Sequence, residues 1–185
     1  MLRTPLVALS PLVALAALTA PALAQDWTVD HDASSVGFET TVSGGAVSGG
    51  FETWTADITL DPDNLEAASI DAAVTTASGS TGNRQMDDSM LSNAGLNPTD
   101  FETARFVSDD IRATETGYEA HGTMTMRGSE QPVVMPFTLA IADGRAVADS
   151  RFVIARADFG VGGSSWGSAA AEVTLVLHIE ADAAP

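Results

Sequence analysis

Histidine is the side chain with the widest chemical range in this sequence, and the chain contains three, His31, His121 and His178. A zinc site needs several His, Cys or acidic ligands close together, usually at short spacings along one element. None of the three has another histidine near it, and the chain contains no cysteine. We therefore predict that each histidine is an exposed strand residue and that the protein binds no metal.

Nucleophilic and acid–base catalysis also lack a suitable arrangement of residues. One Gly-x-Ser-x-Gly match occurs, at residues 163–167, but it falls in a predicted glycine-rich loop and not between a strand and a helix, and the absence of cysteine excludes a thiolate nucleophile. Acidic pairs such as Asp87-Asp88 are expected by chance among 25 acidic residues, and the acidic segment 61–66 lacks the central glycine of a calcium loop. The sequence predicts a protein that is not an enzyme and needs no cofactor.

The charge balance excludes further classes of partner. Eight arginines and no lysines oppose 25 acidic residues, which gives a formal net charge of −17. Binding to nucleic acid or to an anionic membrane surface needs clustered basic residues, because both partners are negatively charged. We predict no nucleic-acid partner and no electrostatic membrane binding.

Residues 1–24 have the composition of a secretory signal peptide. Arg3 is followed by apolar runs within residues 6–18, and the segment ends in the small-residue sequence Ala22-Leu23-Ala24. A membrane anchor is the alternative, but prolines interrupt the segment and the apolar runs are shorter than a spanning helix requires. We predict cleavage after Ala24 and a periplasmic domain of residues 25–185, with seven basic against 25 acidic side chains and a charge of −18.

The elements of this domain are predicted from the period of its apolar residues. From Asp26 onward they alternate with period two, which is typical of strands with one buried face. Alternating stretches cover 36–38, 54–60, 68–74, 104–106, 118–126, 133–141, 152–154 and 173–179. One segment differs, because Thr81-Gly82-Asn83 can cap a short helix that carries Met86, Met90 and Leu91 on one face and ends at Gly95.

The fold class that follows is all-β, an up-and-down antiparallel barrel of about eight strands with one short helix. Closure removes the exposed strand edges of such a series, and a β-sandwich is the alternative. Several small residues share the phase of the large apolar ones: Ala56, Ala68, Ala72, Ala104, Ser108, Ala120 and Gly122. They indicate either an unfilled cavity or room for bulky neighbours in a packed core, and packing alone leaves both open.

A series of short motifs in a fixed order resembles the YceI-like, polyisoprenoid-binding family of periplasmic proteins. The motifs are Trp27-Thr28-Val29-Asp30, Ser34 to Phe38, Gly50-Phe51, Ile58 to Asp63, Thr81-Gly82-Asn83, Ala104 to Ser108, Gly122 to Gly128 and Arg156 to Gly162. The resemblance implies a lipocalin-like barrel whose elongated cavity holds an isoprenoid tail without catalysis. Some relatives are associated with b-type cytochromes of the inner membrane, so such a cytochrome is a predicted partner. The oligomeric state is left open, a homodimer being one option.

Candidate ligand-binding residues are the large inward-phase side chains and the apolar face of the helix. They are Phe38, Trp54, Ile58, Ile70, Val74, Met86, Met90, Phe106, Tyr118, Met124, Phe137, Phe152, Ile154 and Arg156. Many family members carry an arginine where this chain has Met86, so the resemblance favours a neutral head group, such as that of a quinone, over a polyprenyl diphosphate.

Arg156 is the remaining inward-phase cation. Its structural alternatives are an ion pair with Asp158 or a cap on the end of the barrel. The alternative function is a periplasmic stress or assembly factor that has a filled core and acts through its acidic surface.

Overall fold

A computed structural model describes residues 25–163 and 166–185; the predicted signal peptide and Ser164-Ser165 lie outside the described residues. The described chain forms eleven strands and one α-helix, with three short 3-10 helices labelled η1 to η3. The strands are β1 (Asp26–Val29), β2 (Ser35–Val42), β3 (Gly45–Phe51), β4 (Trp54–Thr59), β5 (Ser69–Thr75), β6 (Gly79–Ser80), β7 (Thr103–Ala113), β8 (Tyr118–Met126), β9 (Ser129–Ala142), β10 (Arg145–Ala155) and β11 (Glu172–Ala183). The helices are η1 (Leu65–Ala67), η2 (Thr76–Ser78), α1 (Arg84–Met90) and η3 (Arg156–Phe159).

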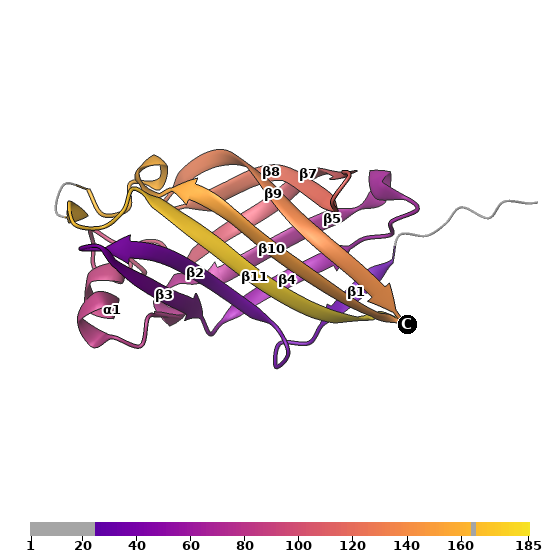
Figure 1. The fold of residues 1–185 in the computed structure, drawn as a ribbon, viewed down its shortest axis with the longest axis horizontal. Helices are drawn as coiled ribbons and strands as arrows, with labels where there is room; N and C mark the ends of the chain where they lie inside the picture. Colours follow the sequence, from indigo (N-terminus) through magenta and orange to yellow (C-terminus); the bar gives the residue numbers. More distant parts are fainter. Residues whose placement is uncertain (1–24, 164–165) are drawn as a thin grey trace, which may run out of the picture.

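The strands close into an up-and-down antiparallel barrel (Figure 1). The eleven strands of the described chain occupy eight positions around the barrel. Three of these are interrupted positions, each made of two consecutive strands with a break between them: β1 and β2, β3 and β4, and β5 and β6. β11 closes the barrel, since it pairs with β1 near its carboxyl end and with β2 further back. The predicted barrel with one helix is confirmed, and the alternative of a sandwich is wrong.

Local side-chain bonds explain why the first strand position is interrupted. Asp30 Oδ1 accepts a hydrogen bond from the Ala33 amide at 3.2 Å, which turns the chain out of the sheet after β1. Ser34 then accepts at Oγ from the Glu180 amide at 2.9 Å and so takes the place of a backbone partner for β11. The barrel wall is thereby held to β11 although the strand itself is broken.

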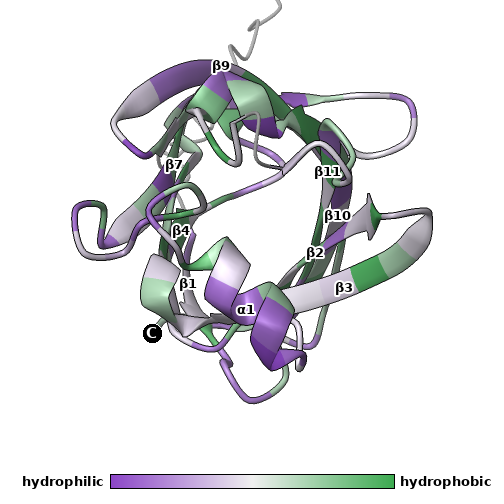
Figure 2. Ribbon diagram, turned by 90° about the vertical axis from the view of Figure 1, so that its left-hand side faces the viewer, coloured by the Kyte–Doolittle hydropathy of each residue, from purple (hydrophilic) through white to green (hydrophobic). Residues whose placement is uncertain are grey.

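The helix α1 lies across one end of the barrel (Figures 1 and 2). Asn83 caps it by accepting from the amides of Gln85 and Met86, as the capping pattern predicted. Asp87 accepts from Ser80 and Thr81, which fixes α1 to β6, and these hydrogen bonds lower the pKa of Asp87, those from Thr81 most. The helix ends at Met90, before the predicted stop at Gly95.

Most of the large apolar residues of the strands are packed in the barrel interior. Alternation places them there because successive side chains of a strand point to opposite faces of the sheet. The most deeply buried large ones include Phe106, Phe152, Met124, Phe137 and Ile111. The interior is therefore lined mainly by apolar side chains, and the ligand site has to be sought within it.

Candidate ligand-binding cavities

Two cavities lie inside the barrel. The first, which we call the barrel cavity, measures about 180 Å³ and is walled almost wholly by apolar side chains of β1, β2, β4, β5, β7, β9, β10 and β11. The second, the helix-side cavity, measures about 470 Å³ and lies among β2, β3, α1, β11 and the segment after β10. Small-molecule sites commonly occupy about 300–1,000 Å³, so the helix-side cavity is in that range and the barrel cavity by itself is below it.

The two cavities adjoin along the barrel axis. On β2, Val36 lines the barrel cavity and the next inward residue, Phe38, lines the helix-side cavity. The same change occurs on β10 between Phe152 and Ile154. The interior is thus divided into two neighbouring compartments, one at the helix end and one deeper in the barrel.

The structure brings most of the predicted site residues to these two cavities. Seven line the barrel cavity: Trp54, Ile58, Ile70, Val74, Phe106, Phe137 and Phe152. Five line the helix-side cavity: Phe38, Met86, Met90, Ile154 and Arg156. Tyr118 and Met124 line neither, because Tyr118 stacks on Phe137 with ring centroids 5.4 Å apart and Met124 is packed in the core.

Sequence reasoning missed several wall residues. Trp27, Leu60, Leu139, Leu177, Ile179 and the alanines 146, 148 and 181 line the barrel cavity; Phe51, Leu96, Val161 and Trp166 line the helix-side cavity. The alternation on β9 and β11 marks Leu139, Leu177 and Ile179 as inward, so that signal was present. Trp27 closes the far end, since its indole Nε1 donates to the Leu60 carbonyl at 2.8 Å, a contact that periodicity does not show.

Some of the small inward residues line an unfilled cavity, and others make room for bulky neighbours in the core. Ala56, Ala72 and Ala104, on neighbouring strands, line the barrel cavity and leave it unfilled. Gly122 instead makes room for a ring, because a Cβ there would lie 2.9 Å from Phe106 Cζ. Ser108 is also not a cavity residue, since its Oγ accepts from the Ile70 amide at 2.8 Å.

Three phenylalanines lie against glycines of neighbouring strands. Phe106 lies over Gly122, Phe38 over Gly49 and Phe51 over Gly79. A glycine lets an aromatic ring pack flat on the backbone, which a Cβ would prevent. The rings therefore lie along the wall of the barrel, and this leaves interior volume for the cavities.

Arg156 caps the end of the barrel. β10 ends at Ala155, and the guanidinium donates to the carbonyls of Ala170 and Val161, each at 2.8 Å, and more weakly to those of Trp166 and Ala169. The predicted alternative of an ion pair with Asp158 is wrong, because the carbonyls of the following loop fill these donor positions. Arg156 lines the helix-side cavity, but its hydrogen bonds serve the protein itself.

The polar rim of the helix-side cavity is formed mainly by uncharged side chains. Thr81, Asn83, Gln85, Ser89 and Ser168 contribute to it, and Arg156 is the one charged side chain among its described lining residues. Neutral amides and hydroxyls can donate to or accept from a carbonyl or hydroxyl, but they compensate a buried dianion poorly. The helix-side cavity thus combines apolar walls with neutral polar groups and one arginine.

The histidines take no part in either cavity. His121 and His178 lie on strands as predicted, half-exposed on the outer face, where His121 contacts Glu119 and His178 contacts Asp149 and Glu180. The prediction for His31 is wrong in one respect, because it lies in the turn between β1 and β2. Among the described residues, no group of His, Cys, Asp and Glu is arranged to hold a metal ion.

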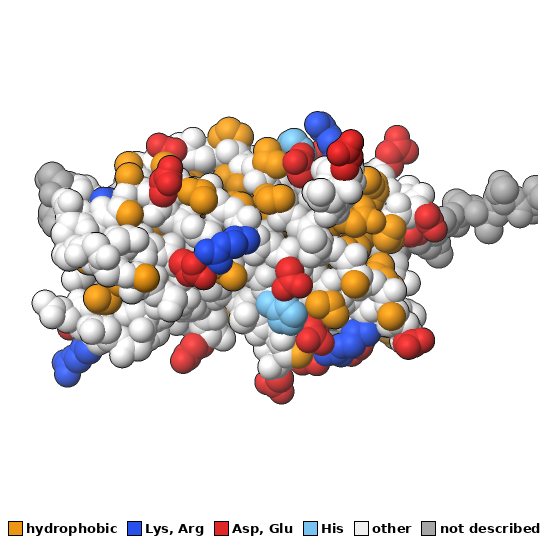
Figure 3. Space-filling view, viewed as in Figure 1, with side chains coloured by type: hydrophobic (Ala, Val, Ile, Leu, Met, Phe, Trp, Pro, Cys, Tyr) orange, Lys and Arg blue, Asp and Glu red, His pale blue; other side chains and the backbone are white. Residues whose placement is uncertain are grey.

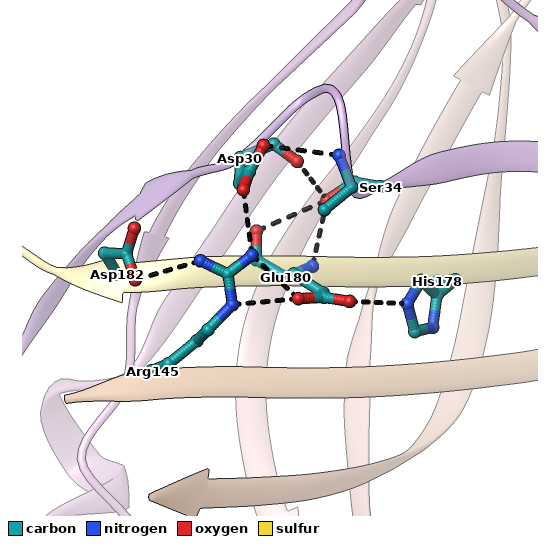
Figure 4. A network of polar contacts seen from close by, with 7 residues as sticks. Asp30, Ser34, Arg145, His178, Glu180 and Asp182 are labelled. Atoms are coloured by element: carbon teal, nitrogen blue, oxygen red, sulfur yellow. Dashed lines mark hydrogen bonds and ion pairs between the residues drawn. The ribbon is translucent and has the colours of Figure 1, made fainter. Parts of the chain in front are cut away.

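An ion-pair network lies on the outer face near the carboxyl end of β11 (Figure 4). Arg145 contacts Asp30 at 2.8 Å, Glu180 at 2.7 Å and Asp182 at 3.1 Å, and so fastens β10, β11 and the end of β1 together. Hydrogen bonds from Arg145 lower the pKa of Asp30 and Glu180. All the groups are paired with one another, which indicates a structural role.

No helix in the described part of the chain is long and apolar enough to cross a membrane. The fold and the cavities define the class of this protein as a lipocalin-like β-barrel with an apolar interior. The model of the YceI-like domain matches residues 27–181, and the chain belongs to the YceI-like family.

Individual relatives agree with this assignment. The chain is 26% identical over 168 residues to a UPF0312 protein of Yersinia pestis, covering 86% of this chain and 87% of the relative. It superposes on BcnA of Burkholderia cenocepacia with a TM-score of 0.78 at 25% identity, over 83% of this chain and 99% of the other. A polyisoprenoid binding domain from Saccharophagus degradans, implicated in plant cell wall breakdown, shares the fold with a TM-score of 0.66 at 12% identity, over 88% and 99% of the two chains.

Proposed function

We propose that this protein binds a long apolar isoprenoid lipid inside its barrel, for storage or transport and without chemical conversion. The observation that carries the proposal is the pair of adjoining apolar cavities, because an interior filled by side chains would leave no such volume. Burial of hydrocarbon contributes about 0.8 kcal/mol per methylene, so a long tail supplies affinity without specific bonds. The cavities weigh against the alternative of a filled-core factor that acts only through its surface.

The orientation of the ligand follows from the polarity of the two compartments. The tail occupies the barrel cavity, and the head lies at the helix-side rim near Asn83 and Gln85. Because Arg156 already donates to loop carbonyls, it supplies little to an anionic head. An isoprenoid quinone or another uncharged lipid therefore fits better than a polyprenyl diphosphate. We place this activity in the periplasm, where a membrane b-type cytochrome is the predicted partner.

Two measurements test the proposal. Organic extraction of the purified protein followed by mass spectrometry should release an isoprenoid lipid, and competition monitored by tryptophan fluorescence should favour a quinone over a diphosphate of equal tail length. An extract without lipid, together with no quenching by either ligand, would argue for an empty structural barrel. A diphosphate that wins by about tenfold or more would show that an anionic head is recognised.

Substitution of Ala72 by Trp tests whether the tail occupies the barrel cavity. The indole would fill space beside Ala56 and Ala104, so lipid occupancy should fall while the protein stays folded. Valine in place of Thr123, a half-buried residue on β8 that does not line either cavity, is the control. Undiminished lipid in the Trp variant, with a lower melting temperature, would mean that the tail lies elsewhere and that the alanines belong to a packed core.

A further inference from the structure

A long interruption in strand pairing lies in the barrel wall between the interrupted positions β1/β2 and β3/β4. In the described chain, β1 pairs with β4 at Asp26–Thr59 and Trp27–Ile58, and pairing between these two positions resumes only at Val36–Phe51. On its other side β4 pairs with β5 without a break from Trp54–Val74 to Thr59–Ser69. We call the unpaired stretch between Trp27–Ile58 and Val36–Phe51 the seam.

Side chains close the seam where backbone pairing is missing. His31 comes from the turn on one side, and Trp54 begins β4 on the other; their ring centroids are 4.3 Å apart with planes tilted by 50°. Trp54 is only 8% exposed, whereas His31 is exposed on the outer side of the pair. The imidazole therefore lies as a cover over the indole.

The barrel cavity lies directly behind this pair of rings. Trp27 and Val36 border the seam on one side and Trp54, Ala56 and Ile58 on the other, and all five line the barrel cavity. His31 does not line it. A movement of the His31 turn would thus uncover an apolar compartment through the side of the barrel.

The energetics favour movement at the seam over movement between the continuously paired strands of the wall. Opening between continuously paired strands breaks several backbone hydrogen bonds, whereas opening the seam separates one pair of rings worth about 0.5–1.5 kcal/mol beyond its buried area. The two ends of the turn are tied to β11 and β10, Ser34 through the Glu180 amide and Asp30 through Arg145. A movement of His31 at the tip of the turn would therefore leave β1 and β2 in place.

We infer that the seam is a lateral portal through which an apolar chain reaches the barrel cavity, with His31 and Trp54 as its cover. This inference rests on the proposed function, since it needs a ligand with an apolar tail. The portal lets the tail slide in sideways, so the head does not have to pass through the length of the barrel. His31 controls how fast the ligand binds and leaves, and Trp54 forms part of the wall it contacts.

A cover and a wall residue give different kinetics. Removal of a cover lowers the barrier for binding and release equally, so both rate constants rise and Kd stays constant. Stopped-flow quenching of tryptophan emission by a short-tailed isoprenoid quinone measures binding, and transfer to excess uncharged phosphatidylcholine vesicles measures release. For His31→Ala we expect both rates to rise at least about fivefold with Kd unchanged within about twofold. His31→Trp, which enlarges the covering ring, should slow both.

His121→Ala is the matched control, since His121 is an outward histidine on β8, away from the seam. Its rates should equal those of the wild type, and melting temperatures should show that all variants are folded. Equal rates in His31→Ala and His121→Ala, with normal quinone binding, would overturn the portal and leave the helix-side cavity as the route. A change in Kd alone would make His31 a wall residue and overturn the portal too. No quinone binding by the wild type would overturn the proposed function itself.

Discussion

Arg156 shows how one side chain can satisfy a sequence pattern and still serve a different purpose. The alternation Phe152, Ile154, Arg156 places it in the inward phase, and its position beside the helix-side cavity agrees with that. Its donors are nevertheless directed to the carbonyls of Val161 and Ala170. Those carbonyls lie in the segment after β10. The guanidinium therefore stabilises the loop beside the cavity, and its hydrogen-bond donors are already used.

Replacement of Arg156 by Gln should therefore cost stability more than it changes ligand charge preference. Carbonyls left without partners in a half-buried loop cost about 1–3 kcal/mol, and the melting temperature should fall accordingly. Arg112→Gln is the control, because Arg112 forms an exposed pair with Asp110, and such pairs contribute about 0–1 kcal/mol. An Arg156→Gln variant as stable as the wild type, with a lost preference between head groups, would instead make Arg156 a ligand contact.

His178 is the residue that should give the protein a measurable pH dependence. Hydrogen bonds to Asp149 and then Glu180 raise its pKa above the ordinary value of 6.5. A raised pKa in the folded state stabilises the protein fully below 6.5, and this contribution is lost as the pH rises through the raised pKa. The melting temperatures of wild type and His178→Gln should thus differ more at about pH 6 than at about pH 8.

Titration of the His178 ring by NMR gives the direct check. Asp149→Asn removes the largest cause of the shift, so the pKa of His178 should move down toward its ordinary value. Asp143→Asn, in the turn between β9 and β10, is the control and should leave the titration where it is. A His178 pKa that is the same in the wild type and in Asp149→Asn would show that this contact does not hold the imidazolium in solution.

At the scale of elements, strand identity could be predicted from the sequence, but strand interruption could not. The alternation in Val173, Leu175, Leu177 and Ile179 predicted β11, because a barrel wall must bury every second residue. The breaks at 30–34, 52–53 and 76–78 depend on side-chain bonds such as those of Ser34, whose partner Glu180 is far away in the sequence. The seam results from the break between β1 and β2, so the period of the apolar residues could not predict it.

The site could be predicted only in part for a related reason. Phase identified most wall residues, but it cannot show whether a small residue faces a cavity or a neighbouring ring. Ala72 and Gly122 share the inward phase, yet one lines the barrel cavity and the other supports Phe106. That difference depends on which large side chain lies opposite on the neighbouring strand and on its rotamer.

The glycine–phenylalanine pairs lead to a prediction about the sheet. A Cβ at Gly122 would collide with the backbone carbonyl of Val107, so Gly122→Ala should destabilise the protein by about 1–3 kcal/mol. A Cβ at Gly79 meets side-chain atoms and no backbone: the flexible end of Met90 and the edge of the Phe51 ring, each at 3.0 Å. Gly79→Ala should therefore lower the melting temperature much less than Gly122→Ala.

Chemical denaturation of both variants measures the difference, and ligand competition gives a second readout. Because Met90 and Phe51 line the helix-side cavity, Gly79→Ala should weaken lipid binding although the fold is retained. Equal destabilisation by both substitutions would mean that the strands shift to absorb either methyl group. Our account of the rings as fixed against the wall would then be wrong.

At the scale of the whole molecule, acidic side chains dominate the exposed charge (Figure 3). The described exposed arginines largely sit beside carboxylates, as in the pairs Arg105–Asp71 and Arg151–Glu39. Without residues 1–24 the chain carries seven basic against 25 acidic side chains, a net charge of −18. Such a charge produces a negative potential around the barrel, which repels an anionic ligand before any contact is made.

This potential predicts opposite salt responses for charged and neutral lipids. Between about 0.01 M and 0.15 M salt the screening length falls from about 30 Å to about 8 Å, so repulsion of a diphosphate head weakens. The affinity for a polyprenyl diphosphate should then rise severalfold, while that for a polyprenol of the same tail length, the uncharged control, should stay nearly constant. Fluorescence titrations at both salt concentrations measure the two affinities. A diphosphate affinity that falls with salt would require a cationic clamp on the head group, and the neutral rim of the helix-side cavity contains no free cation among its described residues to provide one.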